Sequence, residues 1–291
     1  GGNYNFVIEK MNIENYIDYI CTQLFFINTD WPSRNIRFWR EVDESKWQWL
    51  LFDTDFGFGF AHGADFEMLD FALEENGPSY PNPPWATLLF RKLIENEYFK
   101  SDFINRFADL MNTSLRANNL SEHISQKENM ILSEIQRHQE RWDRTFEFWE
   151  NEVLLLRYFA GDRQDYVQEE IMQKFSISGV NDIYLDIYPP NTGRIDISTL
   201  NIGDFPWTGE YFSDAQLILS AVDVPGYRFA GWSGDITSDS RAIPVTPDDT
   251  VSLIAWFEED VSTQNTLVIN EINYNSSNAA DSEDWVEIYN N

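Results

Sequence analysis

The sequence is poor in the residues that build disulfide frameworks and thiolate or imidazole metal sites. Its 291 residues include one cysteine, Cys21, and three histidines, which are His62, His123 and His138. A single cysteine excludes a disulfide within the chain and a thiolate zinc site. Because the histidines lie far apart in the sequence, a cage of several histidines around a metal ion is not expected either.

Basic residues and long apolar runs are scarce as well. Twenty Lys and Arg stand against 49 Asp and Glu, which gives a formal net charge of −29. This excess argues against nucleic acid or an anionic membrane as the main partner, because both require a basic surface. No run approaches 18 apolar residues, so no segment of the sequence is expected to span a bilayer.

Aromatic residues are abundant by contrast. Eleven Trp, 13 Tyr and 22 Phe predict packed cores, whereas acidic disordered chains lack aromatics. The length suits two domains, or a large domain with an appendage. The chain opens with Gly1-Gly2-Asn3 and closes within strand-like sequence at 286–291, which predicts a fragment of a longer protein with any signal peptide upstream.

The first third of the chain predicts a helix followed by a β-hairpin. Apolar residues recur at steps of three and four over 13–28, which is typical of one helix face. Segments 35–40 and 47–52 alternate as strands do, with a charged turn at 41–45 between them. The second strand leads into Asp53-Thr54-Asp55-Phe56-Gly57-Phe58-Gly59, whose glycines we interpret as turn residues. A proline-rich loop is expected over 74–84.

Residues 85–175 carry helical periodicity, and residues 180–259 carry strand periodicity. Within 85–175 a single apolar row predicts the core of a helix bundle, with His138 as a buried core histidine: Ile124, Ile131, Ile135, His138, Trp142, Phe146, Trp149, Val153 and Leu156. The segment 180–259 predicts a small all-β module, with strands at 183–187, 215–219 and 251–255. Residues 260–266 read as a polar linker, and a new strand is expected from Leu267. The fold class expected from this order is α+β.

Four polar side chains form the strongest candidate for chemistry. Asp30 and Asn35 follow the first amphipathic helix, and Asp53 and Asp55 follow the hairpin. Phosphoryl transfer needs a carboxylate near the attacking hydroxyl and oxygen ligands for divalent cations. Protein kinases supply them as Asp-x4-Asn and then as an Asp after a hairpin, just before Phe-Gly. The residues alone leave a second interpretation open, in which Asp30 is a turn residue and Asp53 and Asp55 are a solvated strand end.

The order of these motifs resembles the CotH family of atypical kinase-like proteins, named for spore coat protein H. The resemblance covers roughly residues 5–176. It rests on Tyr16-Ile17-Asp18-Tyr19, Asp30-Trp31-Pro32 with Asn35, the stretch 49–59 with Asp-x-Asp-x-x-Phe-Gly, the helical segments from Trp85 and Phe99, Arg141-Trp142, and 153–163.

The resemblance implies a mostly helical C-terminal lobe of a kinase-like fold, over residues 3–178, that uses ATP and Mg²⁺ or Mn²⁺ to phosphorylate serine or threonine in a protein substrate. Asp30 would be the catalytic aspartate, and Asn35, Asp53 and Asp55 would bind the metal and nucleotide. Two residues could take the part of the kinase aspartate that precedes Phe-Gly. The spacing in the family favours Asp53 with Phe58-Gly59, whereas the tripeptide Asp-Phe-Gly in this sequence favours Asp55 with Phe56-Gly57. Both assignments stay open. A kinase also needs an upstream half with a phosphate-covering loop and a lysine, which this sequence lacks, so the fragment is expected to be inactive alone.

The rest of the chain resembles modules of bacterial surface proteins. The stretch 225–234 is similar to the Gly-Tyr-x-Phe-x-Gly-Trp signature of internalin-B-type repeats, within a β module over 180–259. Residues 267–291 resemble the truncated start of a lamin-tail β-sandwich. These resemblances imply an exported bacterial protein at the cell surface, with glycan or surface contacts through the β modules. The alternative function is a non-catalytic adhesion scaffold whose carboxylate cluster binds Ca²⁺ structurally.

Overall fold

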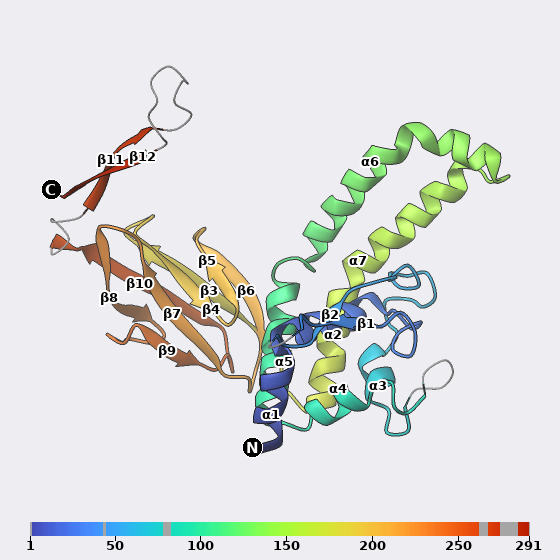
Figure 1. Ribbon diagram of the computed structural model, residues 1–291, viewed down its shortest axis with the longest axis horizontal. Helices are drawn as coiled ribbons and strands as arrows, with labels where there is room; N and C mark the ends of the chain where they lie inside the picture. The colour runs from blue at the N-terminus through green and yellow to red at the C-terminus, as the bar shows by residue number, and fades with distance from the viewer. Residues whose placement is uncertain (1, 43–44, 78–82, 262–266, 274–284, 291) are drawn as a thin grey trace.

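The computed structural model describes residues 2–42, 45–77, 83–261, 267–273 and 285–290. The described chain divides into a helical region and a β region, side by side, with a separate hairpin near the C-terminus (Figure 1). The α+β class expected from the sequence is confirmed. The helices are α1 (Gly2–Lys10), α2 (Ile13–Phe26), α3 (Met68–Leu73), α4 (Leu88–Leu93), α5 (Glu97–Met111), α6 (Ala117–Arg141) and α7 (Phe146–Phe175).

The strands fall into four sheets. A two-stranded hairpin, β1 (Arg37–Trp39) and β2 (Gln48–Leu50), belongs to the helical region. Both strands are shorter than the alternation of 35–40 and 47–52 predicts. The β region comprises β3 (Val180–Tyr188), β4 (Gly193–Ile197), β5 (Leu200–Ile202), β6 (Trp207–Phe212), β7 (Leu217–Asp223), β8 (Tyr227–Gly234), β9 (Ala242–Val245) and β10 (Val251–Glu259).

Helix α2 is the centre of the helical region. The Asn12 side chain caps its first turn by accepting a hydrogen bond from the backbone N–H of Asn15 at 3.2 Å. Its C-cap, Ile27, adopts the left-handed conformation with φ 55°, which ends the helix and turns the chain toward Asp30. Eight of the 14 residues of α2 are buried, as a helix packed on several sides requires.

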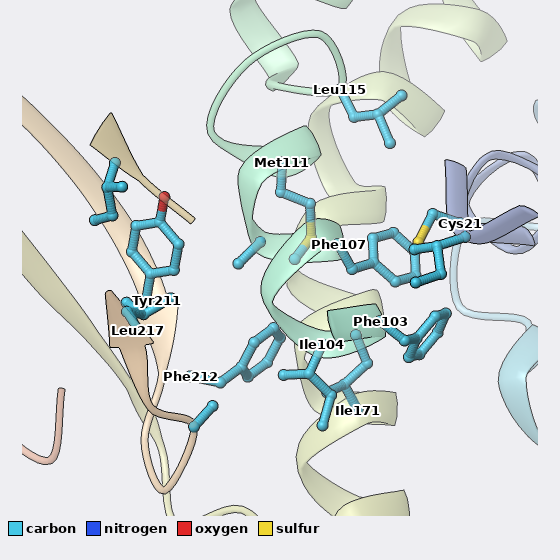
Figure 2. Packing of buried hydrophobic residues seen from close by; sticks show 14 of the residues in the cluster. Cys21, Phe103, Ile104, Phe107, Met111, Leu115, Ile171, Tyr211, Phe212 and Leu217 are labelled. Atoms are coloured by element: carbon cyan, nitrogen blue, oxygen red, sulfur yellow. The ribbon is translucent and has the colours of Figure 1, made fainter. Parts of the chain in front are cut away.

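Helix α5 joins the two regions through one continuous apolar core. Asn96 caps its first turn by accepting from the N–H groups of Tyr98 and Phe99. On one side, Phe103 and Phe107 lie beside Cys21 of α2, and on the other α5 faces residues of the β region such as Phe212 (Figure 2). The two regions therefore share buried surface.

The core predicted for the row from Ile124 to Leu156 is wrong in most of its members. Helices α6 and α7 pair with each other as a long antiparallel arm that projects from the helical region (Figure 1). Trp142 is 61% exposed and Ile131 is 48% exposed, and His138 is exposed rather than buried in a core; Ile135 is the buried member of the row. The periodicity correctly indicated an amphipathic helix. In a two-helix arm, however, each helix has only the face toward its partner covered.

The β region consists of two four-stranded sheets packed face to face. Their strand orders are β6-β3-β10-β8 and β5-β4-β7-β9, and all pairs are antiparallel except β3 with β10. Alternation along β3 buries Ile183 and Leu185 and exposes Tyr184. The Phe257 ring of one sheet lies against Gly193 of the other, at a distance that leaves no room for a Cβ. The strand predicted at 215–219 is observed two residues later, as β7.

The C-terminal segment forms an antiparallel hairpin of β11 (Leu267–Asn273) and β12 (Trp285–Asn290). The predicted strand beginning at Leu267 is therefore confirmed. Most of the predicted linker 260–266 and of the tip of the predicted 74–84 loop lies outside the described residues. Among the described helices, none is both long enough and apolar enough to cross a membrane.

Candidate functional site

The loop after α2 places Asp30 and Asn35 against each other. The side-chain Nδ2 of Asn35 donates a hydrogen bond to Oδ2 of Asp30 at 2.9 Å. Asn35 has φ 53°, a left-handed conformation that asparagine tolerates better than most residues. The guanidinium of Arg34 lies 3.7 Å from the other carboxylate oxygen of Asp30. Both oxygens of Asp30 thus have a neighbour that fixes the orientation of the carboxylate.

The β1–β2 hairpin is attached to α2 by a pair of hydrogen bonds from one side chain. Asn15 donates from Nδ2 to the carbonyl of Trp49 at 3.1 Å, and its Oδ1 accepts from the Trp49 N–H at 2.6 Å. The ring of Tyr16 lies edge-on to Trp49, with centroids 4.7 Å apart. The strand that leads toward Asp53 is therefore held on the same helix that leads toward Asp30.

Asp53 and Asp55 come together through a turn. Strand β2 ends at Leu50 and Asp53 has φ 53°, so a turn and not a continuing strand positions these two side chains. The hydrogen bond with Asp55 is the main cause that raises the pKa of Asp53, followed by desolvation, the charge of Asp55 and the charge of Asp30. The positive charge of Arg37 opposes this rise. The Asp53–Asp55 pair thus lies in the electrostatic field of Asp30.

The two phenylalanines of the turn differ in packing. Phe58 contacts Phe26 and Phe159, with ring centroids 5.4 Å and 4.6 Å away. Phe56 is 40% exposed, and its ring partner is Phe60. The phenylalanine anchored to the helices is therefore the one followed by Gly59, five residues after Asp53.

Gly57 is required where the turn meets α2. The backbone N–H of Phe58 donates to the carbonyl of Phe26 at 2.7 Å, which brings the two backbones into contact. A Cβ on Gly57 would overlap that same carbonyl oxygen. The prediction of a turn glycine is confirmed here, and the physical reason is the close approach of two backbones.

Arg163 of α7 holds the C-terminal end of α2 in place, and no motif in the sequence marked it for this role. Its side chain is fully buried in α7 and donates hydrogen bonds to the carbonyls of Leu24 and Phe25, both at 3.1 Å. It also donates to the carbonyl of Ala64 at 2.7 Å and pairs with Glu170 at 2.8 Å. Burial lowers the pKa of Arg163 and raises the pKa of Glu170, and their mutual attraction opposes both shifts. A sequence signal existed, because Arg163 continues a row of buried positions at steps of four: Phe159, Arg163, Val167 and Ile171.

Asn28 is the second residue that the sequence did not indicate. Its side chain is fully buried and donates to Oε1 of Gln23 at 2.9 Å and to the carbonyl of Asp53 at 3.4 Å. It thereby connects the end of α2 with the turn that carries the paired carboxylates. No local pattern marks such a residue, because its partner Asp53 lies 25 positions away.

The carboxylate and amide oxygens of the candidate site are of the type that Mg²⁺ prefers, but few of them converge. Within the described residues, no group of three or more His, Cys, Asp or Glu side chains is arranged to hold a metal ion. The Asp53–Asp55 pair nevertheless supplies two carboxylates in mutual repulsion, which a divalent cation would relieve. Mg²⁺ is usually held by one or two carboxylates together with substrate phosphates and water, and this pair matches that number of carboxylates.

Comparison with known protein families identifies a family match. Residues 2–167, more than half of the chain, match the protein-family model described as CotH kinase protein. No curated protein and no solved structure matches the chain. The matched range contains Asp30, Asn35, Asp53 and Asp55, and it ends before the β region begins at Val180.

Proposed function

The chain belongs to the CotH kinase protein family, and we propose that its helical region forms the catalytic lobe of a protein kinase that transfers the γ-phosphoryl group of ATP to serine or threonine. The observation that supports this proposal is that the Asn35-bound carboxylate of Asp30 adds to the negative field at Asp53, which is paired with Asp55. Kinase chemistry requires one carboxylate for the hydroxyl and others for metal, at one location.

Asp30 takes the role of catalytic base. Asn35 and Arg34 hold its carboxylate in one orientation, so that it can accept the proton of the substrate hydroxyl. The hydroxyl oxygen then forms a bond to the γ-phosphorus, the bond from that phosphorus to the bridging oxygen breaks, and ADP leaves with the bonding electrons. The hydrogen bond to Asp30 uses the amide nitrogen of Asn35, so that in this proposal the amide oxygen serves as a ligand.

Asp53 and Asp55 take the role of metal-binding residues. When bound, Mg²⁺ or Mn²⁺ would neutralise the charge on the phosphate oxygens. Of the two assignments left open by the sequence, the packing favours Asp53 as the counterpart of the kinase aspartate before Phe-Gly. Phe58 is anchored between α2 and α7, whereas Phe56 is exposed.

A protein kinase also needs a phosphate-covering loop and a lysine, and we propose that this part of the full protein packs on the exposed face of the β1–β2 hairpin. Trp39 of β1 and Leu50 of β2 lie on one face of the hairpin and are 47% and 45% exposed. Large exposed apolar side chains on one face favour a surface that another part of the protein covers. We also propose that the protein is located at a bacterial cell surface and that its β modules contact that surface or glycans.

The test is a radiolabel transfer assay with Mn²⁺, run on residues 1–291 and on a chain extended upstream in the natural gene. We expect negligible transfer by residues 1–291 and transfer by the extended chain, which Asp30→Ala abolishes. The matched control is Asp70→Asn, a carboxylate on α3 outside the site. Transfer that survives Asp30→Ala in the extended chain would overturn the assignment.

A thermal-shift series separates the kinase from the scaffold alternative. On the extended chain, stabilisation by Mn²⁺ that grows when ATP is added supports the kinase. Stabilisation by Ca²⁺ alone, indifferent to ATP, would support a structural role for the carboxylates and contradict phosphoryl transfer.

A further inference from the structure

Asn28 connects the two parts of the candidate site. It precedes Asp30 by two residues, and its side chain reaches the turn that carries Asp53. Its own backbone is held on both sides, because its N–H donates to the carbonyl of Gln23 at 3.2 Å and its carbonyl accepts from the N–H of Trp31 at 3.1 Å. The backbone therefore fixes Asn28 at the C-terminal end of α2.

The side-chain amide of Asn28 donates in two directions. Its Nδ2 donates to Oε1 of Gln23 at 2.9 Å and to the backbone carbonyl of Asp53 at 3.4 Å. Asn28 and Gln23 are both fully buried, so bulk water does not compete for these donors. The shorter contact holds the amide against α2, and the longer one connects it to the turn.

Stability alone does not explain an amide at this position. The Oδ1 of Asn28 is buried and has no hydrogen-bond partner among the described residues. A buried polar atom without a partner destabilises the folded state, whereas an apolar side chain of the same shape avoids this penalty. The presence of an amide therefore points to a use for its donor, and the donor reaches the carbonyl of Asp53.

The backbone at Asp53 needs a restraint. Its φ of 53° is uncommon for a residue other than glycine, and such a conformation persists where the surrounding structure holds it. The far end of the turn is held on α2, since the N–H of Phe58 donates to the carbonyl of Phe26 at 2.7 Å. The contact from Asn28 lies at the near end, so α2 and the residues that follow it hold the turn at both ends.

The separation of the two carboxylates depends on this backbone. Asp53 and Asp55 interact directly, and their like charges favour a wider separation when no cation is bound. A turn released at Asp53 would let the two side chains move apart. One cation would then contact both of them less well.

We infer that Asn28 is a positioning residue of the proposed kinase site, which acts through the backbone carbonyl of Asp53 and keeps Asp53 and Asp55 together for a divalent cation. In this role Asn28 does not itself bind the cation. It fixes the start of the turn relative to the loop of Asp30. The inference rests on the proposed function, because that proposal assigns the carboxylate pair to the metal.

The test uses two variants of the 291-residue chain that each remove an amide bound to the backbone of another segment. In Gln23→Met/Asn28→Leu, both polar partners become apolar side chains of similar size, so the effect on folding should be small. The matched control is Asn112→Leu, at the end of α5 and outside the site. Asn112 donates to the carbonyl of Glu210 at 2.8 Å and accepts from its N–H at 2.9 Å.

Electron paramagnetic resonance titration measures Mn²⁺ affinity, and thermal unfolding measures Tm. The double variant should bind Mn²⁺ at least fivefold more weakly, because removing a group that orients a metal ligand commonly weakens binding about tenfold or more. Its Tm should stay within about 3 °C of wild type. Asn112→Leu should show the reverse, with a lower Tm and an affinity within twofold. Gln23→Met alone keeps the contact between Asn28 and Asp53, so its affinity should also stay within twofold.

Hydrogen exchange at the backbone amides of residues 54–58 is the second readout. Faster exchange confined to this turn in the double variant supports the inference, even if its Tm falls. Faster exchange throughout the helical region would overturn it, because the loss of affinity would then follow from general loosening.

The outcomes also separate this inference from the proposed function. If wild type binds no Mn²⁺, the metal role of the carboxylate pair fails and the inference fails with it. If wild type binds Mn²⁺ and the double variant binds it equally well, the positioning role alone fails. An equal loss of affinity in Asn112→Leu would likewise reject the positioning role and leave the metal site intact.

Discussion

The side chain of Asn35 donates a hydrogen bond to the carboxylate of Asp30 at 2.9 Å, across a loop in which Asn35 itself has φ 53°. This contact joins the two ends of the Asp-x4-Asn motif through the amide nitrogen of Asn35. The same carboxylate adds to the negative field at Asp53, which belongs to a different turn. The division of labour between these carboxylates leads to the first prediction.

Asp53→Ala and Asp55→Ala should each weaken Mn²⁺ binding at least tenfold, while Asp30→Ala should change it less than threefold. In the proposed function the Asp53–Asp55 pair supplies the metal carboxylates, whereas Asp30, held by Asn35, accepts the proton of the hydroxyl. Calorimetric titration of the three variants measures this. An Asp30→Ala variant that loses metal as badly as Asp55→Ala would contradict the division of roles.

Arg163→Met should destabilise the fold by about 3–5 kcal/mol, because it leaves the largely buried carboxylate of Glu170 without its cation. It also removes the donors that hold the carbonyls of Leu24 and Phe25 at the end of α2. Urea unfolding measures the change in the free energy of unfolding. Adding Glu170→Gln to this variant should restore part of the loss, and no recovery would mean that the uncompensated charge is not the cause.

Gly57→Ala and Gly161→Ala should have opposite effects on stability. A Cβ at position 57 overlaps the carbonyl oxygen of Phe26, so we expect destabilisation of about 1–3 kcal/mol. Gly161 lies within α7 with nothing within 4 Å of its would-be Cβ, so alanine should stabilise by about 0.5–1 kcal/mol. Thermal unfolding compares the two. Equal tolerance at both positions would show that the turn is not docked on α2 in solution.

Asp109→Asn should change how stability depends on pH. Burial raises the pKa of Asp109 above its unfolded value, although hydrogen bonds from Thr199, Ser198 and Tyr211 oppose the rise. Between the unfolded and the folded pKa the native state binds more protons than the unfolded state. The contribution of Asp109 to stability is therefore fully present below the unfolded pKa and is lost as pH rises through the folded pKa.

The measurement is urea unfolding of wild type and Asp109→Asn at a series of pH values from 4 to 7. We expect the stability of wild type relative to the variant to fall as pH rises across this range. Asp239→Asn, at an exposed position of the β region, serves as the control and should give a constant difference. A constant difference for Asp109→Asn as well would show that burial does not govern its ionisation.

The sequence by itself determined the order of elements and indicated the candidate site residues. The steps of three and four over 13–28 reappear as α2, and the alternation over 183–187 reappears within β3. Such predictions succeed because the period of a helix or strand is a local property, written in residues a few positions apart. The pairing of Asp-x4-Asn with a later hairpin and two aspartates is likewise readable along the chain.

Only the tertiary structure decided which residues support the site and which apolar faces are covered. Asn15 binds the backbone of Trp49 across 34 positions, and Arg163 binds that of Leu24 across 139. The helical pattern was the same for buried Ile135 and exposed Trp142, because a pattern shows which face of a helix is apolar and not what lies against it. The partner of a face or of a buried polar group is set by how the chain folds back on itself, and that information is absent from any local window of the sequence.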